Sequence, residues 1–194
     1  MSTRTLVIIG SVWPEPSSSA AGARMLQLIR LLRLRFDSVV FACAAEPGAG
    51  CAPLQDFGAE SARIRLNCDS FDQWLARLSP DAVLYDRFMT EEQFGWRVAQ
   101  TCPEALRLLD TEDLHSLRGA REQLLKEQLT EARAQGGLHE CGPVLASAEL
   151  LYQRMAVSDL AQRELAAIYR CDLSLIISEF EMQLLEVQFR FPPD

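Results

Sequence analysis

The densest group of chemically capable side chains follows a short apolar run in the second half of the chain. Within six positions it holds three carboxylates, Asp110, Glu112 and Asp113, and one of the two histidines, His115. Carboxylates beside a histidine can set its tautomer and raise its pKa, which suits hydroxyl binding or proton transfer. Asp113 and His115 are therefore candidate catalytic residues, and Asp110 and Glu112 candidate substrate ligands. The same carboxylates could instead only cap a helix.

Two further groups follow other apolar runs. Asp86 and Arg87 place a carboxylate next to a guanidinium, which could hold a polar ligand bidentately or form a local ion pair. Ser178 and Glu181 follow the last apolar run, where they could bind substrate or cap a helix.

A loop of small residues follows the first apolar run and leads into a helical pattern. The N–H groups that begin such a helix could face an anion or a sugar hydroxyl, although the same residues could merely form a turn and a cap. The loop lacks both the GxGxxG and the GxxxxGK[ST] pattern, which argues against a conventional dinucleotide or ATP site. Its candidate substrate-binding residues are Ser18, Ser19, Ala20, Ala21, Gly22 and Arg24.

The elements that must position these residues alternate between short apolar runs and helical spacing. Near-continuous apolar runs are typical of parallel strands covered on both faces, and we predict strands at residues 5–9, 38–43, 82–85 and 172–177. Weaker strand candidates lie at residues 62–66 and 105–109. The pattern predicts an α/β fold with an open, doubly wound, mostly parallel sheet.

Helical spacing at residues 21–35 and 91–100 predicts helices that cover the sheet, and Ser70 and Thr90 are predicted caps. Residues 114–169 predict a long helical pair before the last strand, broken at Gly136, Gly137 and residues 141–143. The second histidine, His139, falls in this break. Residues 179–189 predict a final helix, which the prolines after Phe191 end.

The composition excludes several function classes. The 194 residues are 48% hydrophobic, which suffices for one core in a single domain, residues 1–194. Lys and Arg total 19 against 27 Asp and Glu, a net charge of −8, so we expect no nucleic-acid partner. No apolar run reaches the roughly 18 residues of an integral membrane segment. The six cysteines lack zinc-ligand spacing, so we expect no metal, mostly buried thiols and a cytoplasmic location.

Four segments together resemble bacterial glycosyltransferases of the family-4-like, GT-B type: WPEPSSSAAGARMLQLIRLL, VLYDRFMTEEQFGWRV, LRLLDTEDLHSLR and CDLSLIISEFEMQLL. The resemblance spans nearly the whole chain. It corresponds to the N-terminal, Rossmann-like domain of such an enzyme, which usually holds the acceptor. It also implies a C-terminal, donor-binding domain beyond residue 194.

The resemblance implies transfer of a sugar from a nucleotide-sugar donor to a glycan, small-molecule or protein acceptor. Retention of configuration is expected, with no cofactor and no obligatory metal. Ser19 and Gly22 bound the stretch that matches the family's loop near the donor phosphates or transferred sugar, and His115 lies where relatives often place a histidine facing the sugar. The loop has one glycine where many relatives have two. The paired-Glu motif and the nucleotide-base pocket belong to the second domain, so we expect this domain alone to be inactive.

Two other functions fit the pattern less fully. One is a non-catalytic, Rossmann-like binding module whose long helical pair contacts a protein partner. The other, a nucleotide-dependent epimerase or dehydrogenase, is disfavoured by the missing glycine fingerprint. An isolated half of a two-domain enzyme could also expose an apolar face and form a homodimer.

Overall fold

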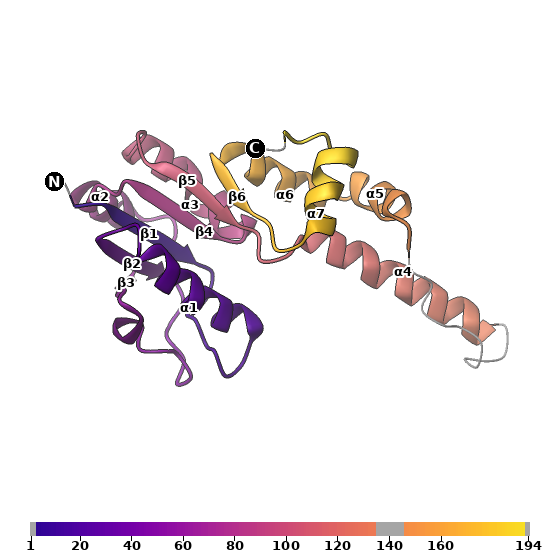
Figure 1. Cartoon of the computed structure of the whole chain (residues 1–194), viewed down its shortest axis with the longest axis horizontal. Helices are drawn as coiled ribbons and strands as arrows, with labels where there is room; N and C mark the ends of the chain where they lie inside the picture. Colours follow the sequence, from indigo (N-terminus) through magenta and orange to yellow (C-terminus); the bar gives the residue numbers. More distant parts are fainter. Residues whose placement is uncertain (1–2, 135–145, 193–194) are drawn as a thin grey trace. The chain divides into compact units, whose positions relative to one another are not determined.

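A computed structural model describes residues 3–134 and 146–192 of the chain (Figure 1). These residues form two compact units. The first contains the chain up to Glu112 together with Ala167–Leu175, and the second contains the described residues of Asp113–Ala166 and those from Ile176 onward.

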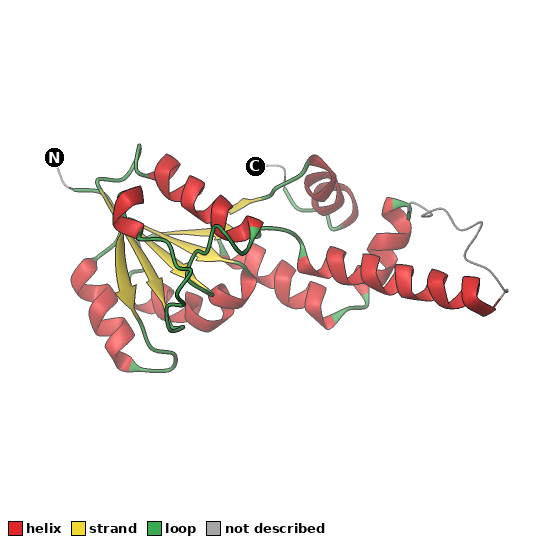
Figure 2. Ribbon diagram, turned by 90° about the horizontal axis from the view of Figure 1, so that it is seen from below, coloured by secondary structure: helices red, strands yellow, loops and turns green. Residues whose placement is uncertain are grey.

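The first unit is built on a six-stranded, wholly parallel sheet with the strand order β3-β2-β1-β4-β5-β6. Helices flank the sheet on both faces (Figure 2), so the predicted open, doubly wound α/β fold is confirmed. The strands are β1 (Thr5–Gly10), β2 (Ser38–Cys43), β3 (Glu60–Arg63), β4 (Ala82–Asp86), β5 (Leu106–Asp110) and β6 (Leu173–Leu175).

Strands β1, β2 and β4 form the buried middle of the sheet. Leu6 of β1 lies opposite Val39 of β2 and Ala82 of β4. Residues from Leu6 to the end of β1 are all buried, because side chains that alternate between the two faces meet helices on both sides. The near-continuous apolar sequence of these strands follows from that double burial.

Three helices of the first unit connect the strands. They are α1 (Ala20–Leu32), α2 (Asp69–Leu78) and α3 (Phe88–Thr101), with a short 3₁₀ helix at Leu54–Phe57. Ile29 of α1 packs in the core with Leu6 and Phe41 of the sheet. The rings of Phe71 in α2 and Phe94 in α3 lie 4.8 Å apart, which joins these two helices.

The second unit is helical. It contains α4 (His115–Ala134), α5 (Ala148–Ala156), most of α6 (Asp159–Arg170), α7 (Glu179–Gln183) and a π-helical turn at Leu184–Gln188. The prediction of a helical pair is therefore wrong, since three helices occupy the described part of residues 114–169. The missed break between α5 and α6 contains only Val157 and Ser158, with no glycine or proline to mark it. The breaks predicted at residues 136–143, with His139, lie outside the described residues.

The structure also corrects two predicted helix caps and the predicted burial of most cysteines. Helix α2 has Cys68 as its N-cap, and α3 has Arg87, so neither Ser70 nor Thr90 is a cap. The Thr90 hydroxyl instead donates to backbone carbonyls of the preceding turn at 3.0 Å. Cys43 is buried as predicted, but the other four described cysteines are half-buried because they lie outside the central strands.

Candidate functional site

The strand order reverses between β1 and β4, and this point organises the polar residues of the first unit. From β1 the chain proceeds outward through β2 to β3, whereas β4 starts the other half of the sheet. The loops that leave β1 and β4 therefore diverge at their carboxyl ends and open a crevice, which is where ligands bind in open α/β sheets.

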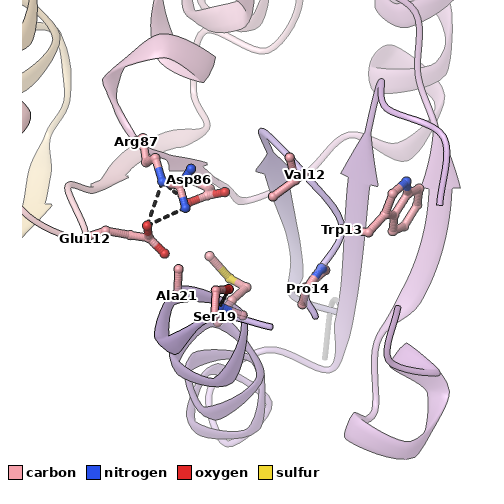
Figure 3. Close-up of a pocket in the computed structure, with 10 residues that line it drawn as sticks. Val12, Trp13, Pro14, Ser19, Ala21, Asp86, Arg87 and Glu112 are labelled. Atoms are coloured by element: carbon pink, nitrogen blue, oxygen red, sulfur yellow. Dashed lines mark hydrogen bonds and ion pairs between the residues drawn. The ribbon is translucent and has the colours of Figure 1, made fainter. Parts of the chain in front are cut away.

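A small hollow, partly open to solvent, lies at this point. Asp86, Arg87 and Glu112 gather on one side of it, and Ser19 and Ala21 stand across from them at the beginning of α1 (Figure 3). The complete lining consists of Val12, Trp13, Pro14, Ser19, Ala21, Gly22, Met25, Asp86, Arg87 and Glu112.

The beginning of α1 is held against the loop that precedes it. Ser19 is the N-cap, and its hydroxyl oxygen accepts a hydrogen bond from the Gly22 backbone N–H at 3.0 Å. A Cβ atom at Gly22 would lie 2.6 Å from the backbone N and O atoms of Glu15. Glycine at this position therefore permits the close approach of the loop and the helix.

Asp86 is the most deeply buried charged residue of the hollow, with 4% of its surface exposed. Its Oδ2 accepts hydrogen bonds from the Ser11 backbone N–H at 3.2 Å and the Ser11 hydroxyl at 3.1 Å. Its Oδ1 has no hydrogen-bond partner among the described residues, and Arg87 Nε lies 3.7 Å away. Burial raises the pKa of Asp86 to about 6; Arg87 opposes this rise and Glu112 adds to it.

Arg87 and Glu112 are paired across the ends of β4 and β5. The Arg87 guanidinium contacts Glu112 Oε2 at 2.6 Å and donates to the Ser11 hydroxyl oxygen at 3.3 Å. Both residues have a positive φ, 72° for Arg87 and 59° for Glu112. This region is unfavourable for side chains other than glycine, so the surrounding contacts hold two strained residues beside the hollow.

A second ion pair joins α1 to the end of β5. Arg24 Nη2 donates to Asp110 Oδ1 at 2.7 Å, and the Asp110 side chain is fully buried. Within the described part of the chain, Asp110 Oδ2 and Arg24 Nε have no hydrogen-bond partner. Four of the predicted ligands, Arg24, Asp86, Asp110 and Glu112, thus belong to one polar network around Arg87, whose backbone N–H donates to the Asp110 carbonyl at 2.8 Å.

Two other residues of the predicted loop, Ser18 and Ala20, lie outside the hollow. The exposed Ser18 donates its hydroxyl hydrogen bond to the Glu15 carbonyl oxygen or carboxylate, at 3.2 and 3.1 Å. Ala20 is exposed and is the first residue of α1. Neither residue lines the hollow, in contrast to Ser19, Ala21 and Gly22.

The predicted catalytic residues lie in the second unit. His115 Nε2 is 3.5 Å from Asp113 Oδ1, and Asp113 Oδ2 is 3.4 Å from Arg118. The His115 backbone N–H donates to Glu164 Oε1 at 2.8 Å. The backbone N–H and hydroxyl of Ser116 donate to Glu164 Oε2 at 3.1 and 2.5 Å, so this buried carboxylate caps the start of α4.

The other predicted pair, Ser178 and Glu181, belongs to the same unit and forms a cap. Ser178 is the N-cap of α7 and accepts from the Glu181 backbone N–H at 3.2 Å. The carboxylate of Glu181 accepts from the Leu114 backbone N–H at 3.3 Å. The capping interpretation of this pair is confirmed, and its role in substrate binding stays a prediction.

Sequence reasoning missed two residues with clear roles. Ser11 supplies both donors to Asp86, and it could have been found because it lies two positions after the end of a predicted strand. Glu164 lies 49 positions from His115 in the middle of a helical pattern, and nothing local in the sequence marks it as a cap.

Comparison of the sequence with protein-family models and with curated proteins finds no match. Across residues 3–134 and 146–192, no group of three or more His, Cys, Asp or Glu side chains is arranged to hold a metal ion. The same residues contain no helix with the length and apolar character needed to cross a membrane.

Proposed function

We propose that the chain is the acceptor-side domain of a glycosyltransferase, and that the hollow between β1 and β4 is its ligand site. The observation that carries this proposal is the composition of the hollow. Residues from three of the four stretches that resemble such enzymes meet there: Ser19, Ala21 and Gly22 at the start of α1, Asp86 with Arg87, and Glu112. Ligands of open parallel sheets bind at this place in the fold.

The chemistry of the hollow is suited to a sugar-transfer reaction. Polar groups for hydroxyl recognition come from Asp86 and Ser19, and an apolar wall comes from Val12 and Met25. A sugar ring presents both kinds of surface, hydroxyl groups at its edge and C–H groups on its faces. In this proposal a second domain binds the nucleotide part of the donor, and the chain by itself does not transfer sugar.

The direct test is calorimetric titration of the gene's complete protein product with nucleotide sugars, followed by a transfer assay. Asp86→Asn is the test variant, and Asp56→Asn, at an exposed position of the same unit, is its matched control. We expect heat and transfer with at least one nucleotide sugar, and loss of transfer only in Asp86→Asn. A complete product that binds no nucleotide sugar contradicts the proposal.

His115 provides a second test in the same assay. The resemblance gives such enzymes a histidine at the position of His115, so we expect His115→Ala to lower transfer and His115→Gln to retain part of it through its amide. Equal transfer by wild type and His115→Ala would remove His115 from the reaction while leaving the ligand site in place.

One observation favours a protein-binding function for the second unit. Leu125 and Leu129, one helical turn apart on α4, are 52% and 37% exposed. An apolar pair of this kind on a long helix could contact a partner. Reversible self-association that Leu125→Glu abolishes would favour this second candidate function.

A further inference from the structure

We infer that a groove between α3, β5 and the last turn of α6 binds a small aromatic carboxylate, whose ring packs on Trp96 and whose carboxylate pairs with Arg107. This groove shares no lining residue with the hollow between β1 and β4. The inference therefore goes beyond the proposed function and does not depend on it.

The first step is the space itself. The groove has a volume of about 400 Å³, is open to solvent, and is lined only by residues of the first unit. Gly95 and Ala99, one helical turn apart on α3, are part of its wall, and their small side chains leave room beside the sheet. A volume of this size lies in the range of small-molecule sites.

The second step is the hydrogen-bonding capacity of Arg107, the second residue of β5. Within the described residues its guanidinium makes one hydrogen bond, from Nη2 to Asp172 Oδ1, at the long distance of 3.5 Å. Its Nε and Nη1 groups have no hydrogen-bond partner there. Arg107 therefore offers donors in a planar fork, which matches the two oxygens of a carboxylate.

The other guanidinium of the groove is already occupied. Arg170 donates from Nε to both carboxylate oxygens of Glu91, at 2.9 and 3.0 Å, and from Nη2 to Oε2 at 2.5 Å. The Glu91 side chain is buried, so this pair is held firmly in the wall. An anionic ligand would therefore pair with Arg107 rather than displace Glu91 from Arg170.

The third step is the aromatic side chain of the groove. Trp96 is 53% exposed and belongs to the lining. The Arg97 guanidinium lies over its ring, 5.1 Å from the centroid, and donates from Nε to Asp72 at 2.7 Å. A second cation on this indole would be repelled by Arg97, whereas the ring of a ligand can stack on the exposed indole surface.

The fourth step decides between two kinds of anion. Glu91 and Glu92 line the groove and Asp172 contacts Arg107, which sets three carboxylates against the guanidiniums of Arg107 and Arg170. A ligand carboxylate brings one negative charge, which its pairing with Arg107 offsets. A phosphate brings up to two, and the surrounding carboxylates repel the second. The groove therefore favours a carboxylate over a phosphate.

The test is a set of ligand-observed NMR titrations of the 194-residue protein. The probes are benzoate and indole-3-acetate, with benzamide as the uncharged ring, acetate as the carboxylate without a ring, and phenyl phosphate as the ring with a phosphate. We expect at least one of the two aromatic carboxylates to bind about tenfold more tightly than each of the other three probes, because only it uses both Arg107 and Trp96.

Four variants locate the binding. We expect Arg107→Gln to weaken the aromatic carboxylate about tenfold and Trp96→Leu to weaken it about fivefold. Arg77→Gln, at an exposed position of α2, is the matched control and should leave the affinity unchanged. Asp86→Asn should also leave it unchanged, because Asp86 lines the separate hollow.

Several results would overturn the inference: no binding of either aromatic carboxylate, equal or tighter binding of benzamide or phenyl phosphate, or an affinity that Arg107→Gln leaves unchanged. A loss in Asp86→Asn matching that in Arg107→Gln would also overturn it, since the ligand would then bind elsewhere. Circular dichroism of each variant separates a loss of binding from a loss of folding. If Arg107→Gln does not fold, Trp96→Leu and the probe series decide the question. The proposed function stands or falls separately, on the titration with nucleotide sugars.

Discussion

The two units each contain a buried carboxylate, and the two carboxylates are satisfied very differently. Glu164 in the second unit receives hydrogen bonds from two backbone N–H groups and one hydroxyl at the start of α4. Asp86 in the first unit receives hydrogen bonds on one oxygen only. Burial raises the pKa of both groups.

The difference distinguishes a structural carboxylate from one suited to binding. At Glu164 the protein supplies donors to both oxygens, so the charge stabilises the end of a helix and offers nothing to a ligand. At Asp86, Oδ1 has no hydrogen-bond donor among the described residues, with Arg87 Nε at 3.7 Å, and the strained residues Arg87 and Glu112 lie beside the same hollow. Strained residues cluster at active sites and ligand clamps, so these features support the ligand site that we propose.

The largest expected effect on stability comes from removing the Glu164 carboxylate, whose two oxygens both accept hydrogen bonds. Glu164→Ala leaves the backbone N–H groups of the half-buried His115 and the buried Ser116 without their acceptor, so we expect the free energy of unfolding to fall by about 3 kcal/mol. Urea denaturation followed by circular dichroism measures it. Glu122→Ala, at an exposed position of α4, serves as the control and should change little. A loss for Glu164→Ala no greater than that of the control would contradict the capping role.

The next effect concerns the beginning of α1. Gly22→Ala places a Cβ against the Glu15 backbone, which cannot move without shifting the loop, so we expect a loss of about 2 kcal/mol in unfolding free energy. The same displacement should weaken ligand binding in the hollow, since Gly22 is part of its lining. Thermal denaturation and sugar titration on one sample measure both. Unchanged stability would show that the loop and α1 are not tightly packed.

Asp86 should oppose folding at neutral pH. Its pKa is raised from 3.8 to about 6, so its contribution to stability is fully present below about pH 4 and is lost as the pH rises through 6. Asp86→Asn keeps an acceptor for Ser11 without the charge, and we expect it to stabilise the protein by about 2 kcal/mol near pH 8.

The measurement for Asp86 is a series of denaturation curves between about pH 4 and pH 8. The wild type should lose stability relative to Asp86→Asn mainly between about pH 4 and pH 6, with little further change at higher pH. The reverse slope, with Asp86→Asn less stable at the alkaline end, would mean that the carboxylate is better satisfied than its contacts indicate.

The smallest expected effect comes from substituting Gly119, a glycine whose surroundings leave space for a Cβ atom, unlike those of Gly22. Among the described residues, a Cβ atom at Gly119 in α4 would meet only the Leu160 side chain, at an ordinary 3.9 Å. Gly119→Ala should therefore raise the unfolding free energy by up to about 1 kcal/mol, because alanine favours a helix interior. Thermal denaturation beside Gly22→Ala makes the comparison. A destabilised Gly119→Ala would show that α4 packs more closely than this distance indicates.

The local elements of the chain were accessible from the sequence, because they depend on neighbouring residues. Apolar runs such as 38–43 and 82–85 predicted strands that the structure contains, with only small changes at their ends. Ser178 was recognised as a cap because its hydroxyl meets an N–H only three positions away. The same reasoning wrongly predicted Ser70 and Thr90 as caps. Helices α2 and α3 begin before these two residues, at Asp69 and Phe88.

The candidate site was predicted as a set of residues but not as an arrangement. Asp86, Arg87 and Glu112 were singled out because they follow apolar runs, yet the partner of Arg87 lies 25 positions away and that of Arg24 lies 86 positions away. Strand order decides such pairings, and no local pattern encodes that β1 and β5 both flank β4. The sequence by itself determined which residues could do chemistry; only the tertiary structure decided which oxygen of Asp86 receives hydrogen bonds, because the donors come from Ser11, 75 positions away at the end of another strand.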